Sequence, residues 1–337
     1  MSSTAHPKRI DIAPLETQVA QLLGEAGASP HVARIIAANC VGCERDGALS
    51  HGVFRVPGYL SSLRLEGHVD GAATPVIEPV SASYIRVDAA NGFAQPALAE
   101  AEPAIEAALA ETGLALVAMR DSHHFSALWP DIEQYARRGY FALTMVAAGI
   151  PYVAPRGLTQ PVFSTNPFAF ASPSAGSDPV VVDFATSVMS HGDVQLARDA
   201  GRQVPIGVGT DGAGNDTTDP HEILTEGNLL PFGEHKGAAL SMMIELLAAG
   251  LTGGKFSYEH AGEKPAGAAT SRTGQLLIVV DPAAGNNDAF AHRASALFDV
   301  LRNSGMDRLP GDKRYATRAR SLRDGVLITP TIEALFA

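Results

Sequence analysis

The segment LALVAMRDSHHFSALWPDIEQYARRGYFALTMV, residues 114–146, decides the fold class that this sequence predicts. It begins with the apolar run 114–119, which is typical of a buried strand, and it ends with a second such run at 141–146. Between them lie a polar turn and a helix predicted over 129–138. A strand, a helix and a strand in succession indicate an α/β protein in which helices cover a sheet.

The same alternation extends outward from this segment. Strands are predicted at 84–87, 180–184 and 276–280, and helices at 96–111, 236–251 and 288–303. The helix over 236–251 is apolar all round, so we expect it to be buried on every side. The first part of the chain is helical in pattern, with predicted helices at 15–25, 30–45 and 53–65. We therefore expect an N-terminal helical region (1–80), an α/β region that binds cofactor and substrate (81–310), and a C-terminal tail (311–337) that packs on the N-terminal part.

Composition excludes several classes of protein. Lys and Arg total 25 against 36 Asp and Glu, a net charge of −11, and such an acidic chain is a poor partner for nucleic acid. Residues 1–14 lack the apolar core of a secretory signal, and no apolar run is long enough for a membrane span, so a cytoplasmic protein without a membrane partner is expected. Cys40 and Cys43 supply two of the four ligands of a structural zinc and no second pair exists, so no metal is expected.

One glycine pattern is misleading. Residues 207–212 read G-x-G-x-x-G, but the Asp-Gly and Asp-Pro pairs that follow are turn formers and cannot open a helix. The dinucleotide fingerprint works only between a strand and a helix, so a nicotinamide nucleotide would need another scaffold.

A polar group on the third predicted helix is the first candidate site. His51, Arg55 and Tyr59 recur every four residues and would share one helix face, and Ser50 precedes them as a cap or as a partner of the imidazole. Arginine can hold a carboxylate in a two-point fork, and histidine can donate a proton near neutral pH. The spacing fits a surface helix equally well.

Further polar groups follow the predicted strands. His123 and His124 lie in the polar segment that follows the run 114–119, and the ends of strands are where α/β sheets bind ligands. Adjacent residues in a strand point to opposite faces, and an ordinary strand–helix turn explains the segment equally well. Thr165 lies in a turn formed by Asn-Pro, where hydrogen bonds to its own backbone are the simpler explanation. Asp183 ends a strand, and Asp193 is a candidate carboxylate partner for a histidine that the sequence alone does not pair with His51.

Two basic groups could meet a nucleotide phosphate. His235 and Lys236 open the helix predicted over 236–251, where cations oppose the helix dipole unless an anion binds there. Arg308, Lys313 and Arg314 flank a Pro-Gly turn, which alone would be a solvated basic loop.

Taken together and in order, these pieces resemble the type-2 malate/L-lactate dehydrogenase family over residues 10–330. The motifs that carry the resemblance are SHGVFRVPGY (50–59), SHHFSAL (122–128), FSTNPFAF (163–170), VVDFATS (181–187) and FGEHKGAALSMMIELLAAGLTGG (232–254). The resemblance implies a non-Rossmann NAD(P)-binding mixed-sheet α/β fold, with an N-terminal helical part and a tail that packs back, in a homodimer.

Within the family, HGVFRVPGYLSSL, HHFSALWPDIE and SHGDVQLA are most similar to the Δ1-piperideine-2-carboxylate/Δ1-pyrroline-2-carboxylate reductases. This branch implies NADPH, with NADH possible, as hydride donor to C2 of a cyclic imine. The resemblance makes His51 the proton donor, with Ser50 and Asp193 as its relay. It makes Arg55, helped by Thr165, the residue that binds the substrate carboxylate. Tyr59 is a further candidate for substrate binding, because it shares the predicted helix face of His51 and Arg55. The residues expected to contact the cofactor are His123, His124, Phe125, Ser126, Ala127, Asp183, Phe184, Ala185, His235, Lys236, Arg308, Lys313 and Arg314.

Alternatives stay open at this point. In the alcohol-oxidising branches, the histidine that matches His124 is the acid/base, so His124 rivals His51. A 2-hydroxy acid dehydrogenase of the same family, acting on a 2-oxo acid of the malate or lactate type, is the second functional hypothesis, and a non-catalytic ligand-binding protein is the third. Lysine, proline and hydroxyproline catabolism are all compatible with a cyclic imino acid substrate.

Overall fold

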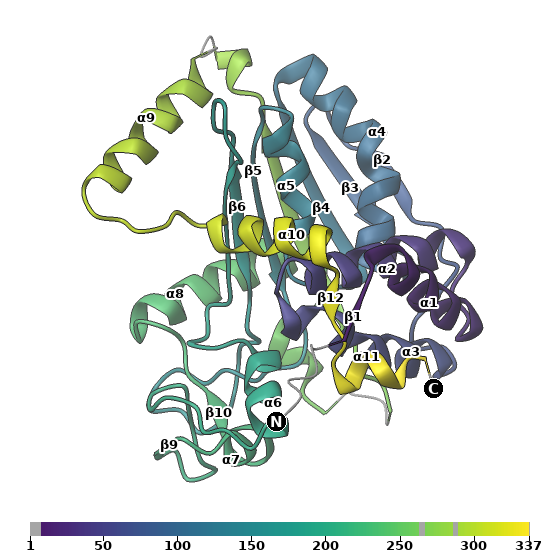
Figure 1. Ribbon diagram of the computed structural model, residues 1–337, viewed down its shortest axis with the longest axis vertical. Coiled ribbons are helices and arrows are strands. Elements are labelled where there is room, and N and C mark those ends of the chain that lie inside the picture. The colour runs from purple at the N-terminus through teal and green to yellow at the C-terminus, as the bar shows by residue number, and fades with distance from the viewer. Residues whose placement is uncertain (1–7, 263–266, 286–288, 337) are drawn as a thin grey trace, which may run out of the picture.

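The computed structural model describes residues 8–262, 267–285 and 289–336, and its centre is a seven-stranded sheet (Figure 1). β3 and β4 pair in parallel, and every other neighbouring pair of this sheet is antiparallel. The α/β class with a mixed sheet is therefore confirmed. In spatial order the strands are β2 (Val76–Pro79), β3 (Tyr84–Asp88), β4 (Leu114–His123), β11 (Arg272–Val280), β5 (Phe141–Ala147), β6 (Phe168–Ser172) and β7 (Val180–Phe184).

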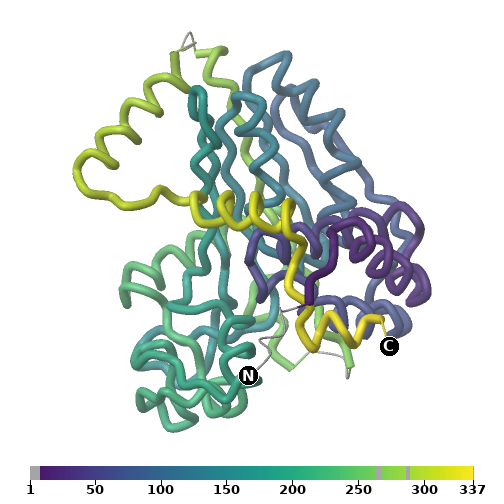
Figure 2. Tube along the Cα trace, in the orientation of Figure 1, coloured from purple at the N-terminus to yellow at the C-terminus, as the bar shows by residue number. Residues whose placement is uncertain are grey.

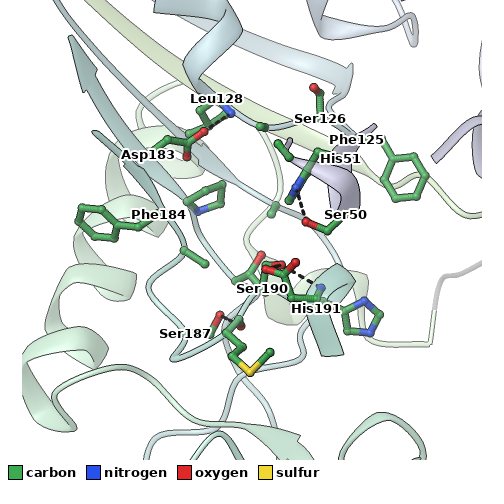
Figure 3. A pocket seen from close by; sticks show the side chains of 18 of the residues that line it. Ser50, His51, Phe125, Ser126, Leu128, Asp183, Phe184, Ser187, Ser190 and His191 are labelled. Atoms are coloured by element: carbon green, nitrogen blue, oxygen red, sulfur yellow. Dashed lines mark hydrogen bonds between the residues drawn. The ribbon is translucent and has the colours of Figure 1, made fainter. Parts of the chain in front are cut away.

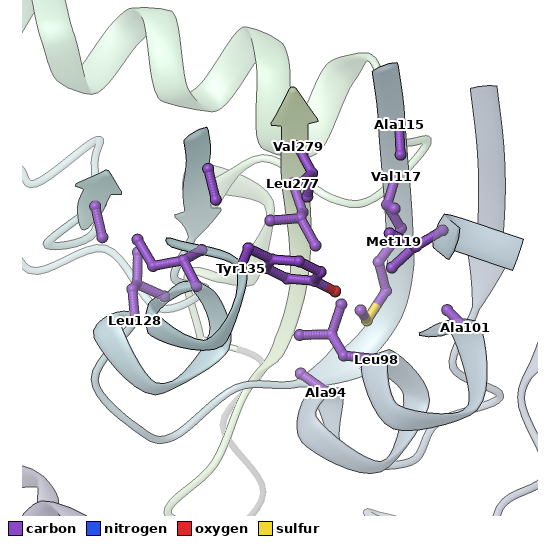
Figure 4. Close-up of a cluster of buried hydrophobic side chains, with 14 of the residues drawn as sticks. Ala94, Leu98, Ala101, Ala115, Val117, Met119, Leu128, Tyr135, Leu277 and Val279 are labelled. Atoms are coloured by element: carbon purple, nitrogen blue, oxygen red, sulfur yellow. The ribbon is translucent and has the colours of Figure 1, made fainter. Parts of the chain in front are cut away.

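Helices cover both faces of the sheet. Because side chains alternate along a strand, Leu277 and Val279 of β11 face one side and Leu276 faces the other. The first side packs against α4 (Ala94–Thr112) and α5 (Trp129–Arg137) and forms the largest apolar core, with Tyr135 at its centre (Figure 4). The second side packs against α8 (His235–Ile244) and its π-helical continuation η3 (Glu245–Gly250).

The helix predicted over 236–251 is not buried on every side. Met242 and Leu246 are 54% and 56% exposed, because the sheet covers only one face of α8 and η3. The prediction of complete burial was wrong, and an apolar row remains on the surface of the single chain.

The first two N-terminal helices form where the sequence predicts them, and the third differs from its prediction. α1 (Ile12–Glu25) packs on α2 (Pro30–Arg45), which Ser29 caps by accepting a hydrogen bond from the Val32 N–H. The single helix predicted over 53–65 is instead a pair of 3-10 turns, η1 (Leu49–His51) and η2 (Val53–Arg55), followed by α3 (Val56–Arg64). Pro57 lies at the start of α3, where a missing N–H costs nothing.

The C-terminal tail packs back on the N-terminal helices, as predicted (Figure 1). β1 (Arg9–Ile10) pairs antiparallel with β12 (Val326–Leu327). Ile332 and Leu335, in and just after α11 (Pro330–Ala334), belong to the same apolar core as Leu15 and Ile36. An additional helix, α10 (Asp312–Asp324), crosses from the sheet to this core.

The remaining elements lie at the periphery of the sheet. The G-x-G-x-x-G run passes through β8 (Gly209–Thr210) of a small sheet, and the next element is the strand β9 (Asp216–Thr217) rather than a helix, so its rejection as a dinucleotide fingerprint is confirmed. α9 (Phe290–Asn303) stands away from the body and has no buried residue (Figure 2); Asp288, its predicted start, lies outside the described residues. The small elements are α6 (His191–Asp199), α7 (Pro220–Thr225), β8 (Gly209–Thr210), β9 (Asp216–Thr217), β10 (Asn228–Leu229), η4 (Ser257–His260) and η5 (Pro282–Gly285).

Candidate active site

A cavity of about 1050 Å³ brings together most of the residues predicted from the sequence (Figure 3). It lies among the first 3-10 turn, the chain after β4, the Asn-Pro turn, the end of β7 and the start of α6. The predicted residues in its lining are Ser50, His51, Arg55, His124, Phe125, Ser126, Ala127, Thr165, Asp183, Phe184, Ala185, Asp193 and Arg314.

His51 is held by its neighbours in the 3-10 turn. The hydroxyl of Ser50 lies 3.0 Å from Nδ1 of His51. The buried carboxylate of Glu44 accepts the Val53 N–H at 3.0 Å, and a side chain at Gly52 would overlap with that carboxylate. Burial, followed by the nearby charges of Arg55 and His124, lowers the pKa of His51 to about 3. This imidazole is therefore neutral in the cavity as it stands.

Arg55 is a buried cation without a carboxylate partner. Its guanidinium lies over the ring of Phe125, 4.4 Å from the centroid, and Gly192 packs against it. Its Nε is buried and has no hydrogen-bond acceptor, and no ion pair to it exists among the described residues. Burial lowers the pKa of Arg55, although Tyr59 and Asp193 oppose that shift. A buried and uncompensated charge is costly, so this site favours an anionic ligand.

His124 has the carboxylate partner that His51 lacks. Its Nε2 lies 2.9 Å from Oδ2 of Asp131, in the first turn of α5, and both side chains are 2% exposed. Gln275 of β11 donates a second hydrogen bond to the same oxygen at 2.9 Å. Sequence analysis missed Asp131, because it lies in a polar stretch of a predicted helix and is buried only by the sheet beneath it.

Two predicted site residues lie away from the cavity. The chain reaches Tyr59 through 3-10 turns and not through one helix, so Tyr59 leaves the expected polar face and packs edge-on against Phe93 and Phe125 in the core. The strand β4 extends to His123, which therefore points to the opposite side from His124 and bonds Thr270 and Asn91. Neither side chain lines the cavity, which corrects both expectations.

His123 gives the protein a defined sensitivity to acid. Burial, followed by the charges of His68 and Arg272, lowers its pKa to about 3, whereas an unfolded histidine titrates near 6.5. Below pH 6.5 the unfolded chain binds a proton that the folded ring does not, so the free energy of unfolding decreases, by about 2 kcal/mol at pH 5. Urea unfolding of the wild type and of His123→Gln at pH 7.5 and pH 5 should show this difference. Identical pH dependence in the two proteins would contradict it.

The Ser50–His51–Asp193 relay is only partly assembled. Asp193 lines the cavity, but its carboxylate accepts the hydroxyl of Ser190 at 2.7 Å and makes no hydrogen bond to Ser50 or His51 within the described chain. An aromatic pair that the sequence analysis did not select stands beside it. Tyr152 and His191 line the cavity with their rings stacked at a centroid distance of 4.0 Å.

The other end of the cavity fits a nucleotide. The carboxylate of Asp183 accepts the N–H groups of Leu128 and Trp129 at the start of α5, each at 2.9 Å. Arg314 lies over the Trp129 ring, and its buried Nε has no hydrogen-bond partner. A carboxylate and a partly unsatisfied guanidinium in one wall suit the hydroxyl and phosphate groups of a dinucleotide, and the volume admits one together with a small substrate.

Four predicted cofactor residues do not line this cavity: His235, Lys236, Arg308 and Lys313 are exposed. Their contact with a cofactor stays a prediction. The described residues contain no cluster of histidine, cysteine or carboxylate groups that could hold a metal, and Cys40 and Cys43 are buried free thiols. Of the described helices, none is long and apolar enough to cross a membrane.

The profile of the malate/L-lactate dehydrogenase family matches residues 10–335. The chain belongs to this family. It is 54% identical over 302 residues to a Δ1-pyrroline-2-carboxylate/Δ1-piperideine-2-carboxylate reductase of Pseudomonas syringae pv. tomato, covering 90% of this chain and 88% of the relative. It is 49% identical over 327 residues to a reductase of the same name from Pseudomonas putida, covering 97% and 95%.

A solved structure agrees with this assignment. The crystal structure of Δ1-piperideine-2-carboxylate reductase from Pseudomonas syringae superimposes with a TM-score of 0.93 at 50% identity, over 97% of this chain and 98% of that one. As a member of the malate/L-lactate dehydrogenase family, the protein is an oxidoreductase that uses a nicotinamide nucleotide. Its nucleotide therefore binds without a Rossmann fingerprint.

Proposed function

We propose that the protein reduces Δ1-piperideine-2-carboxylate to pipecolate and Δ1-pyrroline-2-carboxylate to proline with NADPH. The names of the two relatives support this substrate class. The observation that carries the proposal is Arg55, a buried cation for which the described residues offer no carboxylate partner, in the same cavity as the imidazoles of His51 and His124. The 2-carboxylate of a cyclic imine would compensate its charge, with Thr165 in the same lining as a further hydrogen-bonding group.

The protein has to supply one proton. A bound reduced nicotinamide would supply the hydride for C2 of the imine, and the ring nitrogen has to gain a proton, which a side chain of the cavity is placed to donate. The family resemblance assigns this role to His51, with Ser50 and Asp193 as its relay. Because the charge of Arg55 contributes to the low pKa of His51, a substrate carboxylate on Arg55 would make protonation of His51 easier. Separate His51→Gln and His124→Gln variants identify the donor, since its loss should lower kcat by about 10²- to 10⁴-fold.

NADPH is proposed over NADH. Arg314 in the cavity wall and the exposed Lys313 beside it are two cations suited to a 2′-phosphate. We expect a higher kcat/KM with NADPH, and a loss of that preference in Lys313→Ala. Equal efficiency with both cofactors would remove this part of the proposal.

The function is tested by comparing initial rates on both cyclic imines and on pyruvate, with the absorbance of the reduced cofactor as readout. We expect turnover of the imines. The second candidate, a 2-hydroxy acid dehydrogenase, is favoured by the His124–Asp131 pair, because a carboxylate-bound imidazole suits oxidation of an alcohol. Turnover of pyruvate alone would replace the imine proposal with this one.

We also propose that the protein is a cytoplasmic homodimer. The exposed apolar row that includes Met242 and Leu246 supports a second chain on this face. Light scattering should give twice the mass of one chain, and Leu246→Glu should lower it. A monomeric wild type would contradict the proposal.

A further inference from the structure

The backbone of Thr165 is tied to the helix α8 by a chain of buried hydrogen bonds. The carbonyl oxygen of Thr165 accepts the N–H of Thr186 at 2.9 Å and the hydroxyl of Thr186 at 3.0 Å. The hydroxyl of Ser241, in α8, donates in turn to Oγ1 of Thr186 at 2.8 Å. Thr186 and Ser241 are both buried, so these bonds are made within the protein and not with solvent.

The next residue of the turn, Asn166, is tied to the end of the same helix. Its φ of +36° lies in the left-handed region, which asparagine enters more readily than most residues. Its side-chain oxygen accepts the N–H of Ala148 at 3.3 Å, and its NH₂ group donates to Oε1 of Glu245 at 2.8 Å. These two bonds hold the side chain at both ends. Because rotation about φ of Asn166 moves the preceding peptide, they also hold Thr165 in place.

Glu245 is suited to this contact as a carboxylate and not as an amide. It is 5% exposed, and its two oxygens receive different donors: Asn166 at Oε1 and the N–H of Ser257 at Oε2, the latter at 2.9 Å. Glutamine has one oxygen, so one of these donors would face its NH₂ group. Glu245 also begins η3, and π-helical turns are rare and often lie at functional sites.

We propose that Glu245 is a positioning residue for substrate binding. Together with Ser241, four residues earlier on the same helix face, it holds the turn at which the Thr165 side chain meets the substrate carboxylate. The Thr165 side chain lines the cavity, whereas its backbone and its neighbour Asn166 take up the bonds from the helix. The inference rests on the proposed function, in which Arg55 and Thr165 bind the 2-carboxylate of the imine.

Substitution of Glu245 should affect the substrate and not the cofactor. In Glu245→Gln we expect the KM for Δ1-piperideine-2-carboxylate to increase about tenfold, because the turn loses one of the bonds that hold it. The KM for NADPH should stay within about twofold of the wild type, whereas a general loosening of the fold would change both constants. A folded Glu245→Gln variant with an unchanged KM for the imine would overturn the inference.

Exchanging the two side chains should restore binding. Asn166→Asp alone brings two buried carboxylates together and should also increase the KM for the imine. In Asn166→Asp/Glu245→Gln, the new amide can donate to the new carboxylate, which still accepts the N–H of Ala148, while the oxygen of the amide accepts the N–H of Ser257. We expect a KM within about threefold of the wild type. A double variant that regains wild-type stability but keeps the high KM would overturn the inference.

A second pair of variants tests whether Glu245 acts through Thr165. Thr165→Val removes the hydroxyl, so Glu245→Gln should increase the KM for the imine by less than about twofold in that background. Increases that multiply would overturn the inference. If Glu245→Gln is too unstable to assay, Ser241→Ala makes the same test through Thr186, with an expected increase of about threefold in wild type and none in Thr165→Val. No increase in Ser241→Ala would then overturn it.

Glu259→Gln is the matched control. The carboxylate of Glu259 accepts the N–H of Phe256 at 2.8 Å, in the same turn as Ser257, but it is exposed and belongs to neither link to Thr165. Its replacement should leave both KM values unchanged, and an increase equal to that of Glu245→Gln would overturn the inference. If the wild type reduced pyruvate and no cyclic imine, the proposed function would fail. The KM for pyruvate, which also carries a carboxylate beside the reacting carbon, would still decide the role of Glu245.

Discussion

Arg55→Met should remove nearly all imine reduction without lowering the stability of the fold. Loss of the cation that binds a buried carboxylate costs about 3–5 kcal/mol, or roughly 10²- to 10⁴-fold in kcat/KM. Arg55 forms no ion pair with the described residues, so methionine of similar volume removes a buried charge without breaking an ion pair among them. The free energy of unfolding should therefore stay equal or increase.

Two comparisons separate carboxylate binding from other effects of this substitution. Arg64→Met changes an exposed arginine on the same stretch of chain and should alter neither activity nor stability. Δ1-Piperideine, which lacks the carboxylate, should be reduced equally poorly by the wild type and by Arg55→Met. A variant that retained wild-type kcat/KM on the carboxylate substrate would refute this role of Arg55.

Arg318→Met should cause the largest loss of stability. From α10, Arg318 donates to the carboxylate of Asp46 at the end of α2 and to that of Glu133 in α5, with contacts of 2.6–3.1 Å. Both carboxylates are buried, and the hydrogen bonds of Arg318 lower the pKa of Glu133 against the opposing effect of its burial. Methionine would leave two buried charges short of a partner, at a cost of about 3–5 kcal/mol.

Urea unfolding measures this effect. The control is Arg323→Met in the same helix, because Arg323 is 69% exposed and pairs only with Asp324 within the described chain. An exposed pair of this kind contributes less than about 1 kcal/mol. Equal losses in the two variants would show that the buried network does not hold the tail on the N-terminal helices.

The elements that could be predicted from the sequence are those in which the pattern of apolar residues indicates burial. The runs 114–119, 276–280 and 141–146 are neighbouring central strands in that spatial order, and apolar residues on both faces reveal them. The edge strand β2 was missed because three of its four residues are exposed. α10 was missed because it has no apolar stripe and is held by the ion pairs of Arg318.

The same distinction applies to the site. His51, Arg55 and His124 lie in local motifs, and the fold brings them to one cavity. Asp131 could not be selected, because its burial depends on Gln275 from a strand 144 residues away in the chain. Tyr59 was placed wrongly because a helical spacing assumes a continuous helix, whereas two 3-10 turns precede α3.

The most direct test follows the hydride itself. The protein would be incubated with NADPH deuterated at the transferring position of C4 and with Δ1-piperideine-2-carboxylate, and the product identified by mass spectrometry and NMR. The account predicts pipecolate with a single deuterium at C2. Failure to form pipecolate, under conditions in which the same preparation reduces pyruvate, would contradict it.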